Sequence, residues 1–136
     1  MSGSLTTPMA AHVALAAFLY VLLTAARAPA VWGIGRRSDG SNPWVGVEAR
    51  ISANLSNQFE WPLFFHVACL LLLQFQASLA ALALAWVFVA GRVLHSAVQI
   101  LGRNVRLRGI VFTTNFLAVL GLWALVVLAA GGPPVE

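Results

Sequence analysis

Residues 57–65 read NQFEWPLFF and place a carboxylate and a proline at the start of an apolar run that continues as HVACLLLL to residue 73. A carboxylate in or near hydrocarbon is costly unless it is paired or solvated, so such residues usually face a bundle interior or a cavity. Arginine is the partner that cannot escape by losing its proton. We therefore expect Glu60 to pair with Arg50, Arg92 or Arg108, either as part of a binding site or as a structural clamp.

The composition on both sides of this stretch is that of an integral membrane protein. Of the 136 residues, 60% are hydrophobic and 9% are charged, and the mean hydropathy is +0.87. A soluble domain of this size cannot bury that much apolar side chain, because too many of its positions face water. We predict an all-α fold, the four-helix bundle subunit of an integral membrane protein, in one domain over residues 1–136.

Four membrane spans are predicted, at about residues 9–27, 46–73, 77–102 and 108–130. The first 26 residues carry no charged side chain and lack the basic flank of a secretory signal peptide, so we interpret them as a retained first helix. The charge-free run 61–91 is too long for one crossing, and QFQAS near its middle predicts a tight hairpin. The last span ends before GGPP, a sequence that stops helices.

The basic residues give the predicted orientation. All eight are arginines, and they lie in or beside the first and third connections: Arg27, Arg36, Arg37, Arg50, Arg92, Arg103, Arg106 and Arg108. By the positive-inside rule, both termini then face outward and the two arginine-rich connections face the cytoplasm. No stacking platform accompanies these arginines, so we do not expect a nucleic-acid partner.

Two polar stripes approach this cytoplasmic side on different spans. They consist of Arg50, Asn54 and Asn57 near Glu60, and of Arg92, His95, Gln99 and Arg103. For Arg36, Arg37 and Arg103 we favour the simpler interpretation that they snorkel and anchor helix ends. Pro62 removes one helix hydrogen bond and can free backbone carbonyls that neighbouring groups must then satisfy. Carboxylate and proline together predict a polar pocket between helices.

Metal and nucleophile chemistry are not indicated by the sequence. His12, His66 and His95 lie on three different spans with no second ligand at i+3 or i+4, and Cys69 is the only cysteine. There is no GxSxG motif and no glycine-rich phosphate loop. We therefore expect no metal site, and any chemistry must use arginine.

Three stretches carry a family resemblance. They are Arg50, Asn54, Asn57 and Glu60 followed by WPLFF, then AWVFVAGRVLHS at residues 85–96, and then NVRLR at 104–108. Together they resemble the membrane-associated proteins in eicosanoid and glutathione metabolism, the MAPEG family, and in particular its short bacterial branch. The match covers nearly the whole chain.

The resemblance implies a homotrimer in the lipid bilayer of a bacterial inner membrane, with glutathione bound between subunits at the cytoplasmic half of the membrane. The termini, which the positive-inside rule places outward, are then periplasmic. It implies that Asn57 and Glu60 hold the tripeptide and that Arg108 stabilises its thiolate. The positions of Arg27, Arg50, Arg92 and His95 match family residues that line or support the opening of the glutathione site. The implied activity is that of a glutathione-dependent transferase or peroxidase acting on lipophilic electrophiles or lipid hydroperoxides.

Two other functions are considered beside this one. Tyr20 is the only tyrosine, and Gln99 and Phe112 occupy positions where eicosanoid-type members tend to carry hydroxylated aromatics. A member that has lost the chemistry and binds a lipid or small anion is therefore the alternative. A small multidrug exporter also has four spans and a membrane carboxylate, but there the carboxylate lies in the first helix, which has none here.

Overall fold

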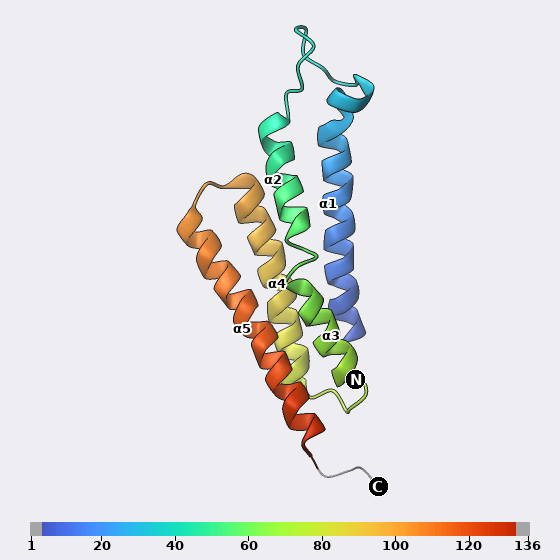
Figure 1. The fold of residues 1–136 in the computed structure, drawn as a ribbon, viewed down its shortest axis with the longest axis vertical. Helices are drawn as coiled ribbons and strands as arrows, with labels where there is room; N and C mark the ends of the chain where they lie inside the picture. Colours follow the sequence, from blue (N-terminus) through green and yellow to red (C-terminus); the bar gives the residue numbers. More distant parts are fainter. Residues whose placement is uncertain (1–3, 133–136) are drawn as a thin grey trace.

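The computed structural model describes residues 4–132 and folds them into five α-helices (Figure 1). They are α1 (Thr6–Trp32), α2 (Val45–Ser56), α3 (Pro62–Leu72), α4 (Leu79–Leu101) and α5 (Val105–Ala130). No strand occurs among the described residues, which confirms the all-α prediction for them.

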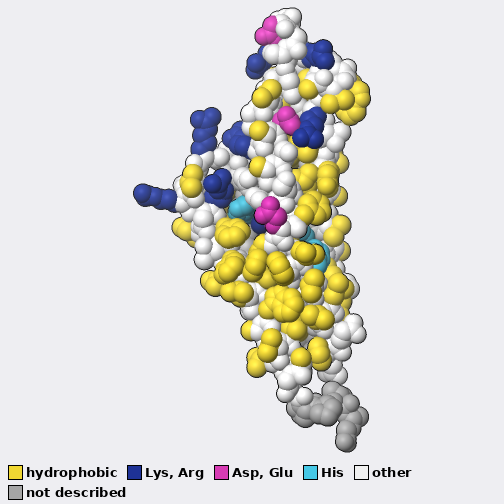
Figure 2. All heavy atoms as spheres, in the orientation of Figure 1, with side chains coloured by type: hydrophobic (Ala, Val, Ile, Leu, Met, Phe, Trp, Pro, Cys, Tyr) yellow, Lys and Arg dark blue, Asp and Glu magenta, His cyan; other side chains and the backbone are white. Residues whose placement is uncertain are grey.

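Three of the helices, α1, α4 and α5, are long and apolar enough to cross a membrane. Basic side chains gather in the upper part of the molecule in Figure 2, while hydrophobic side chains spread over the lower part. A separation of this kind is what a bilayer imposes, because charged groups collect at the interface and apolar groups face lipid. Length, composition and charge distribution thus support an integral membrane protein.

The expected second span, 46–73, is two helices and not one, which corrects the prediction. Turns at residues 57–61 separate α2 from α3, and there the N–H groups of Gln58 and Phe59 donate to carbonyls three residues earlier. Proline is tolerated at the first position of a helix, where its missing N–H would have no partner. Pro62 therefore begins α3 instead of kinking one long helix. The two helices still run in the same direction, antiparallel to α1 (Figure 1).

The first helix continues past its predicted end at residue 27 and includes Pro29. Its last carbonyl groups are capped by Arg36, whose Nε donates to Pro29 O at 2.6 Å and whose Nη2 donates to Ala30 O at 3.2 Å. Gly33 then adopts a φ of 72°, the left-handed conformation that ends many helices. These contacts explain why α1 extends into a segment rich in loop-forming residues.

The helices divide into two packing groups. Within the first, formed by α3, α4 and α5, Phe65 stacks on Phe88 with ring centroids 4.2 Å apart, and Val119 and Leu122 are fully buried. In the second, α2 packs against α1 and α4. The helices α2 and α5 make no close backbone contact, and Figure 1 shows α5 leaning away from α2.

Candidate functional site

The divergence of α2 and α5 leaves a cleft with α4 between them. Two adjoining cavities of about 410 and 430 Å³ lie along it and share three lining residues. Five of the seven residues predicted for the site line this cleft: Asn57, Glu60, Arg92, His95 and Arg108. The structure thus brings together side chains from the α2–α3 turn, from α4 and from the first turn of α5.

Arg92 of α4 lines one of the two cavities of the cleft. Only 1% of its surface is exposed, although it projects from a membrane-spanning helix. Its Nε donates to Gln58 Oε1 and its Nη2 donates to the carbonyl oxygen of Asn57, each at 3.1 Å. Both acceptors are neutral, so these hydrogen bonds hold the guanidinium group without cancelling its charge. Arg92 therefore contributes a positive charge to the wall of the cleft.

The free carbonyl of Asn57 is a direct product of the break between α2 and α3. In a continuous helix it would accept from the backbone N–H four residues later. Here the chain turns before that bond can form, and the Arg92 guanidinium takes its place. Pro62 was expected to free a carbonyl one turn before it by removing a helix hydrogen bond; the carbonyl that Arg92 binds is instead freed by the break between α2 and α3.

A network of amides supports Arg92 from behind. Gln58 Nε2 donates to Asn54 Oδ1 at 3.1 Å and to Ser96 Oγ at 3.2 Å, and Asn54 Nδ2 donates to Gln99 Oε1 at 2.9 Å. Sequence reasoning overlooked Gln58, which is buried and is the hub of this network. Its position four residues after Asn54, on the same helical face, was the available signal.

His95 and Arg108 line the same cavity of the cleft, one from α4 and the other from the first turn of α5. His95 is only 4% exposed, and its Nδ1 is buried without a hydrogen-bond partner among the described residues. An unpaired polar atom in a buried position is costly unless a ligand satisfies it. The exposed Arg108 adds a cation within reach of the same space.

Glu60 lies on the wall of the same cleft, but not in the expected ion pair. It lines the cavity with Arg92 and is exposed, and it makes no salt bridge within residues 4–132. The expectation that an arginine of the same chain pairs with Glu60 is therefore wrong. Arg92 is occupied by neutral acceptors, which leaves the carboxylate free for a cationic group from elsewhere.

Two predicted site residues lie outside the cleft. Arg27 at the upper end of α1 forms a salt bridge with Glu48 of α2, with 2.8 Å between Nε and Oε1. Arg50 lines neither cavity, and its Nε is buried without a partner among the described residues. Arg27 thus links α1 to α2, and Arg50 lies on α2 without lining the cleft.

The cleft combines cations, a free carboxylate and apolar walls. Trp61, Phe64 and Phe112 form much of the apolar wall beside Glu60 and Arg92. Such a surface can hold a zwitterionic or anionic molecule while a lipophilic molecule lies against the aromatic rings. No group of three or more His, Cys, Asp or Glu side chains suited to a metal ion occurs in residues 4–132.

The model of the MAPEG family matches residues 5–128, nearly the whole chain. Searches of curated proteins and of solved structures gave no significant match.

Proposed function

Because the chain belongs to the MAPEG family, we propose that it is a membrane transferase or peroxidase that uses glutathione against lipophilic electrophiles or lipid hydroperoxides. Members of this family generally use glutathione as cosubstrate. The observation that carries the proposal is the uncompensated guanidinium of Arg92 in a cleft that also contains Glu60 and Arg108.

The charges of the cleft complement those of glutathione group by group. The tripeptide has two carboxylates and one ammonium, and the cleft offers two arginines and one carboxylate. We assign the ammonium or an amide to Glu60, aided by Asn57, and a carboxylate to Arg92. The unpaired Nδ1 of His95 is positioned to hydrogen-bond with the peptide.

The proposed role of Arg108 is to stabilise the thiolate. A fixed positive charge beside a thiol favours its anionic form, and the thiolate is the nucleophile. In a transfer reaction its sulfur bonds to the electrophilic carbon, and the leaving group departs with the electron pair. In the peroxidase reaction two glutathione molecules are oxidised to the disulfide while the hydroperoxide is reduced to an alcohol and water.

Ultraviolet absorbance of the thiolate tests this role. Purified protein with glutathione is expected to show the thiolate band, and Arg108→Ala is expected to lower its amplitude roughly tenfold at constant occupancy. Arg106→Ala is the matched control, because Arg106 also lies in the first turn of α5 but lines neither cavity. A wild-type protein that binds glutathione without any thiolate band would remove the catalytic assignment.

The second candidate is a member that binds a lipid or small anion without chemistry. It is favoured by the absence of a hydroxylated aromatic among the residues that line the cleft, where Phe112 is shared by both cavities. Gln99 is not free to take the place of the missing hydroxyl group, since its Oε1 already accepts a hydrogen bond from Asn54. Calorimetry separates the candidates: binding of an anionic lipid without binding of glutathione would support the second.

We also propose that the subunit assembles as a homotrimer in a bacterial inner membrane, with both termini periplasmic. The open cleft between α2 and α5 supports assembly, because one of its sides is unclosed in a single chain. The mass of the detergent-solubilised protein, corrected for bound detergent, distinguishes a trimer from a monomer or dimer.

A further inference from the structure

The cleft continues past Arg108 into a third, smaller cavity of about 40 Å³ at the connection between α4 and α5. This cavity shares Gln99, Val105 and Arg108 with the middle cavity, the one that contains both His95 and Arg108. The middle cavity in turn shares three residues with the first, which contains Glu60 and Arg92. The three cavities therefore follow one another in a fixed order, from the middle of α4 to its C-terminal end.

Arg103 is the cation that the third cavity adds to the cleft. It lines this cavity but neither of the other two, and it makes no salt bridge within residues 4–132. Arg106 is exposed as well but lines none of the three. The first turn of α5 contains no acidic residue, so the positive end of its helix dipole is not offset there. An anionic group in the third cavity thus meets a guanidinium group without a competing carboxylate.

The two amide side chains that line the third cavity do not compete for Arg103 either. Gln99 Oε1 accepts from Asn54 at 2.9 Å, and Asn104 Oδ1 accepts from the backbone N–H of Leu107 at 3.0 Å. Both oxygens are engaged by other donors. The guanidinium group of Arg103 is therefore available to a ligand.

The order of charges along the three cavities matches the order of groups in glutathione, and in this respect the inference rests on the proposed function. The γ-glutamyl residue carries its ammonium and its carboxylate on the same carbon atom, so these two groups must bind side by side. Among the described residues that line the three cavities, Glu60 alone is acidic, and Arg92 lines the same cavity. The γ-glutamyl end is therefore assigned to the first cavity.

The thiol and the second carboxylate then follow along the cleft. The cysteine is the central residue of the tripeptide, and the middle cavity contains Arg108 and the buried, unpaired Nδ1 of His95. The glycine carboxylate lies at the end of the peptide opposite to the ammonium. Arg92 and Arg108 are already assigned to other groups, so the cation for this carboxylate is Arg103.

The length of the peptide fits this arrangement. From Arg92 to Leu101, α4 rises roughly 13 Å at about 1.5 Å per residue. An extended tripeptide spans about 10 Å, and the γ-linkage lengthens its chain further. With the reach of an arginine side chain at each end, one glutathione molecule can contact the first and the third cavity together.

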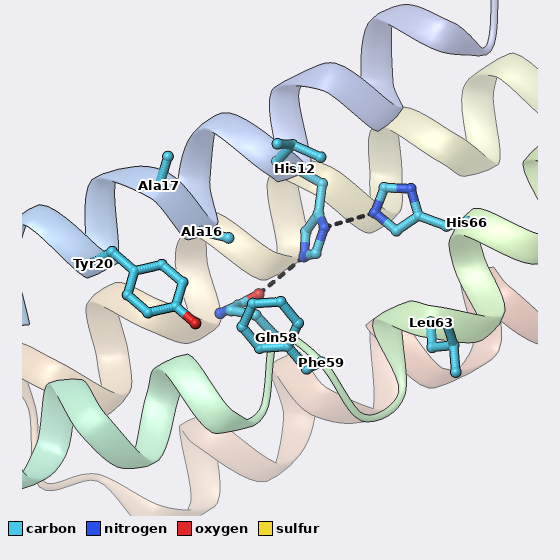
Figure 3. Close-up of a pocket in the computed structure, with 9 residues that line it drawn as sticks. His12, Ala16, Ala17, Tyr20, Gln58, Phe59, Leu63 and His66 are labelled. Carbon is cyan, nitrogen blue, oxygen red and sulfur yellow. Dashed lines mark hydrogen bonds between the residues drawn. The ribbon is translucent and has the colours of Figure 1, made fainter.

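The cavity between α1 and the α2–α3 turn is not an alternative site for the peptide (Figure 3). Its volume is about 320 Å³, but neither arginine nor lysine is among the described residues that line it. Figure 3 shows three of its polar side chains bonded to one another: His12 Nδ1 lies 3.0 Å from His66 Nε2, and His12 Nε2 lies 3.0 Å from Gln58 Oε1. The fourth is the hydroxyl of Tyr20. Two carboxylates would have no guanidinium partner there.

We propose that Arg103 binds the glycine carboxylate of glutathione, and that the peptide lies in the cleft with its γ-glutamyl end beside Glu60 and Arg92. Arg103 is then a binding residue that determines the direction of the peptide, and not only an anchor at a helix end. Because the glycine carboxylate is remote from the sulfur, Arg103 contributes to affinity, while Arg108 acts on the thiolate.

Calorimetry of the full-length protein in phosphatidylcholine nanodiscs tests the assignment, with glutathione and its glycine monoethyl ester as probes. The ester lacks only the negative charge at the glycine end. The wild-type protein is expected to bind the ester roughly tenfold more weakly than glutathione, the loss that corresponds to one hydrogen bond between charged groups. Arg103→Ala is expected to bind both probes as weakly as the wild type binds the ester. Arg106→Ala removes the same charge and is expected to keep the tenfold difference.

Thiolate absorbance at saturating glutathione gives a second readout. Arg103→Ala is expected to match the wild type, whereas Arg108→Ala lowers the band, and an equal fall in both variants would overturn the assignment. It would also be overturned, with the proposed function left standing, by a wild type that binds both probes equally or by an Arg103→Ala protein that still prefers glutathione tenfold. A wild type that binds neither probe would overturn the proposed function together with the assignment.

Discussion

At the scale of single residues, a buried arginine is stabilised by neutral hydrogen-bond acceptors and not by a carboxylate. Arg92 is almost fully buried, yet its hydrogen bonds go to an amide oxygen and a backbone carbonyl. A carboxylate partner would satisfy the guanidinium but would also cancel its attraction for an anionic ligand. Gln58 is a suitable compromise, because its amide accepts from Arg92 and His12 while it donates to Asn54 and Ser96.

Gln58→Leu is expected to destabilise the protein by about 2–4 kcal/mol, since it leaves the buried donors of Arg92 and His12 without an acceptor. Unfolding in mixed micelles by increasing sodium dodecyl sulfate measures the change. Gln74→Leu is the control, because Gln74 is exposed in the connection between α3 and α4. A Gln58→Leu protein as stable as this control would show that the network contributes nothing to folding.

Gln58→Glu separates stability from binding. The carboxylate keeps an acceptor for Arg92 and adds an ion pair, so the fold is expected to persist. The positive charge at the cleft is then neutralised, and we expect glutathione to bind about tenfold more weakly by calorimetry. Unchanged affinity in this variant would mean that Arg92 does not act on the ligand through its charge.

At the scale of elements, the turn at residues 57–61 decides how the site is built. Asn57, Glu60 and Trp61 line the cleft. Gln58 and Phe59 line a separate cavity against α1. Residues 57, 60 and 61 also share one face in a continuous helix, so what the break adds is the free carbonyl of Asn57 that Arg92 binds. The sequence predicted a perturbation near Pro62, but proline can kink a helix or begin one. The contact that favours the break comes from Arg92, on another helix, which no local pattern reveals.

The close approach of α4 and α5 gives a prediction at the same scale. A Cβ atom on Gly91 would lie 1.9 Å from Oδ1 of Asn115, whose side chain is fully buried. Gly91→Ala is therefore expected to destabilise the helix pair by about 1–3 kcal/mol. Gly109→Ala, where a Cβ meets nothing within 4 Å, is the control and is expected to be neutral or slightly stabilising.

A double-mutant cycle identifies the cause of that loss. In an Asn115→Ala background the space beside Gly91 is open, so Gly91→Ala is expected to cost much less, with a coupling of roughly 1 kcal/mol or more. The thermal unfolding of all four proteins in one detergent supplies the cycle. If the effects of the two substitutions are additive, the contact with Asn115 is not the cause of the loss of stability in Gly91→Ala.

At the scale of the whole molecule, composition and periodicity predicted the helical class, the hairpin before α4 and the convergence of two polar stripes. These three features follow from the hydrophobicity of each segment and from the helical period, both of which can be read from the local sequence. The exclusion of Arg27 and Arg50 from the cleft was not predictable in the same way. It follows from the divergence of α2 and α5, and helix crossing is determined by packing between distant segments.

The distribution of arginines over the connections leads to the last prediction, the orientation in the membrane. The connections at the upper end of the molecule contain Arg36, Arg37 and Arg103, and Arg106 and Arg108 follow in the first turn of α5, while the connection between α3 and α4 has no arginine. Translocating arginine-rich connections is unfavourable, so these should remain cytoplasmic and the α3–α4 connection should be periplasmic. Ser38→Cys and Ala77→Cys place a thiol in each type of connection without altering a helix cap.

A membrane-impermeant maleimide applied to intact bacterial cells that express each variant gives the readout. We expect Ala77→Cys to react in intact cells and Ser38→Cys to react only after lysis. The native Cys69 is fully buried in α3 and should remain unlabelled in the parent protein, which is the control. The reverse pattern would place the arginine-rich end, and with it the opening of the cleft near Arg108, outside the cell. A cytoplasmic thiol could not then be the ligand of that cleft.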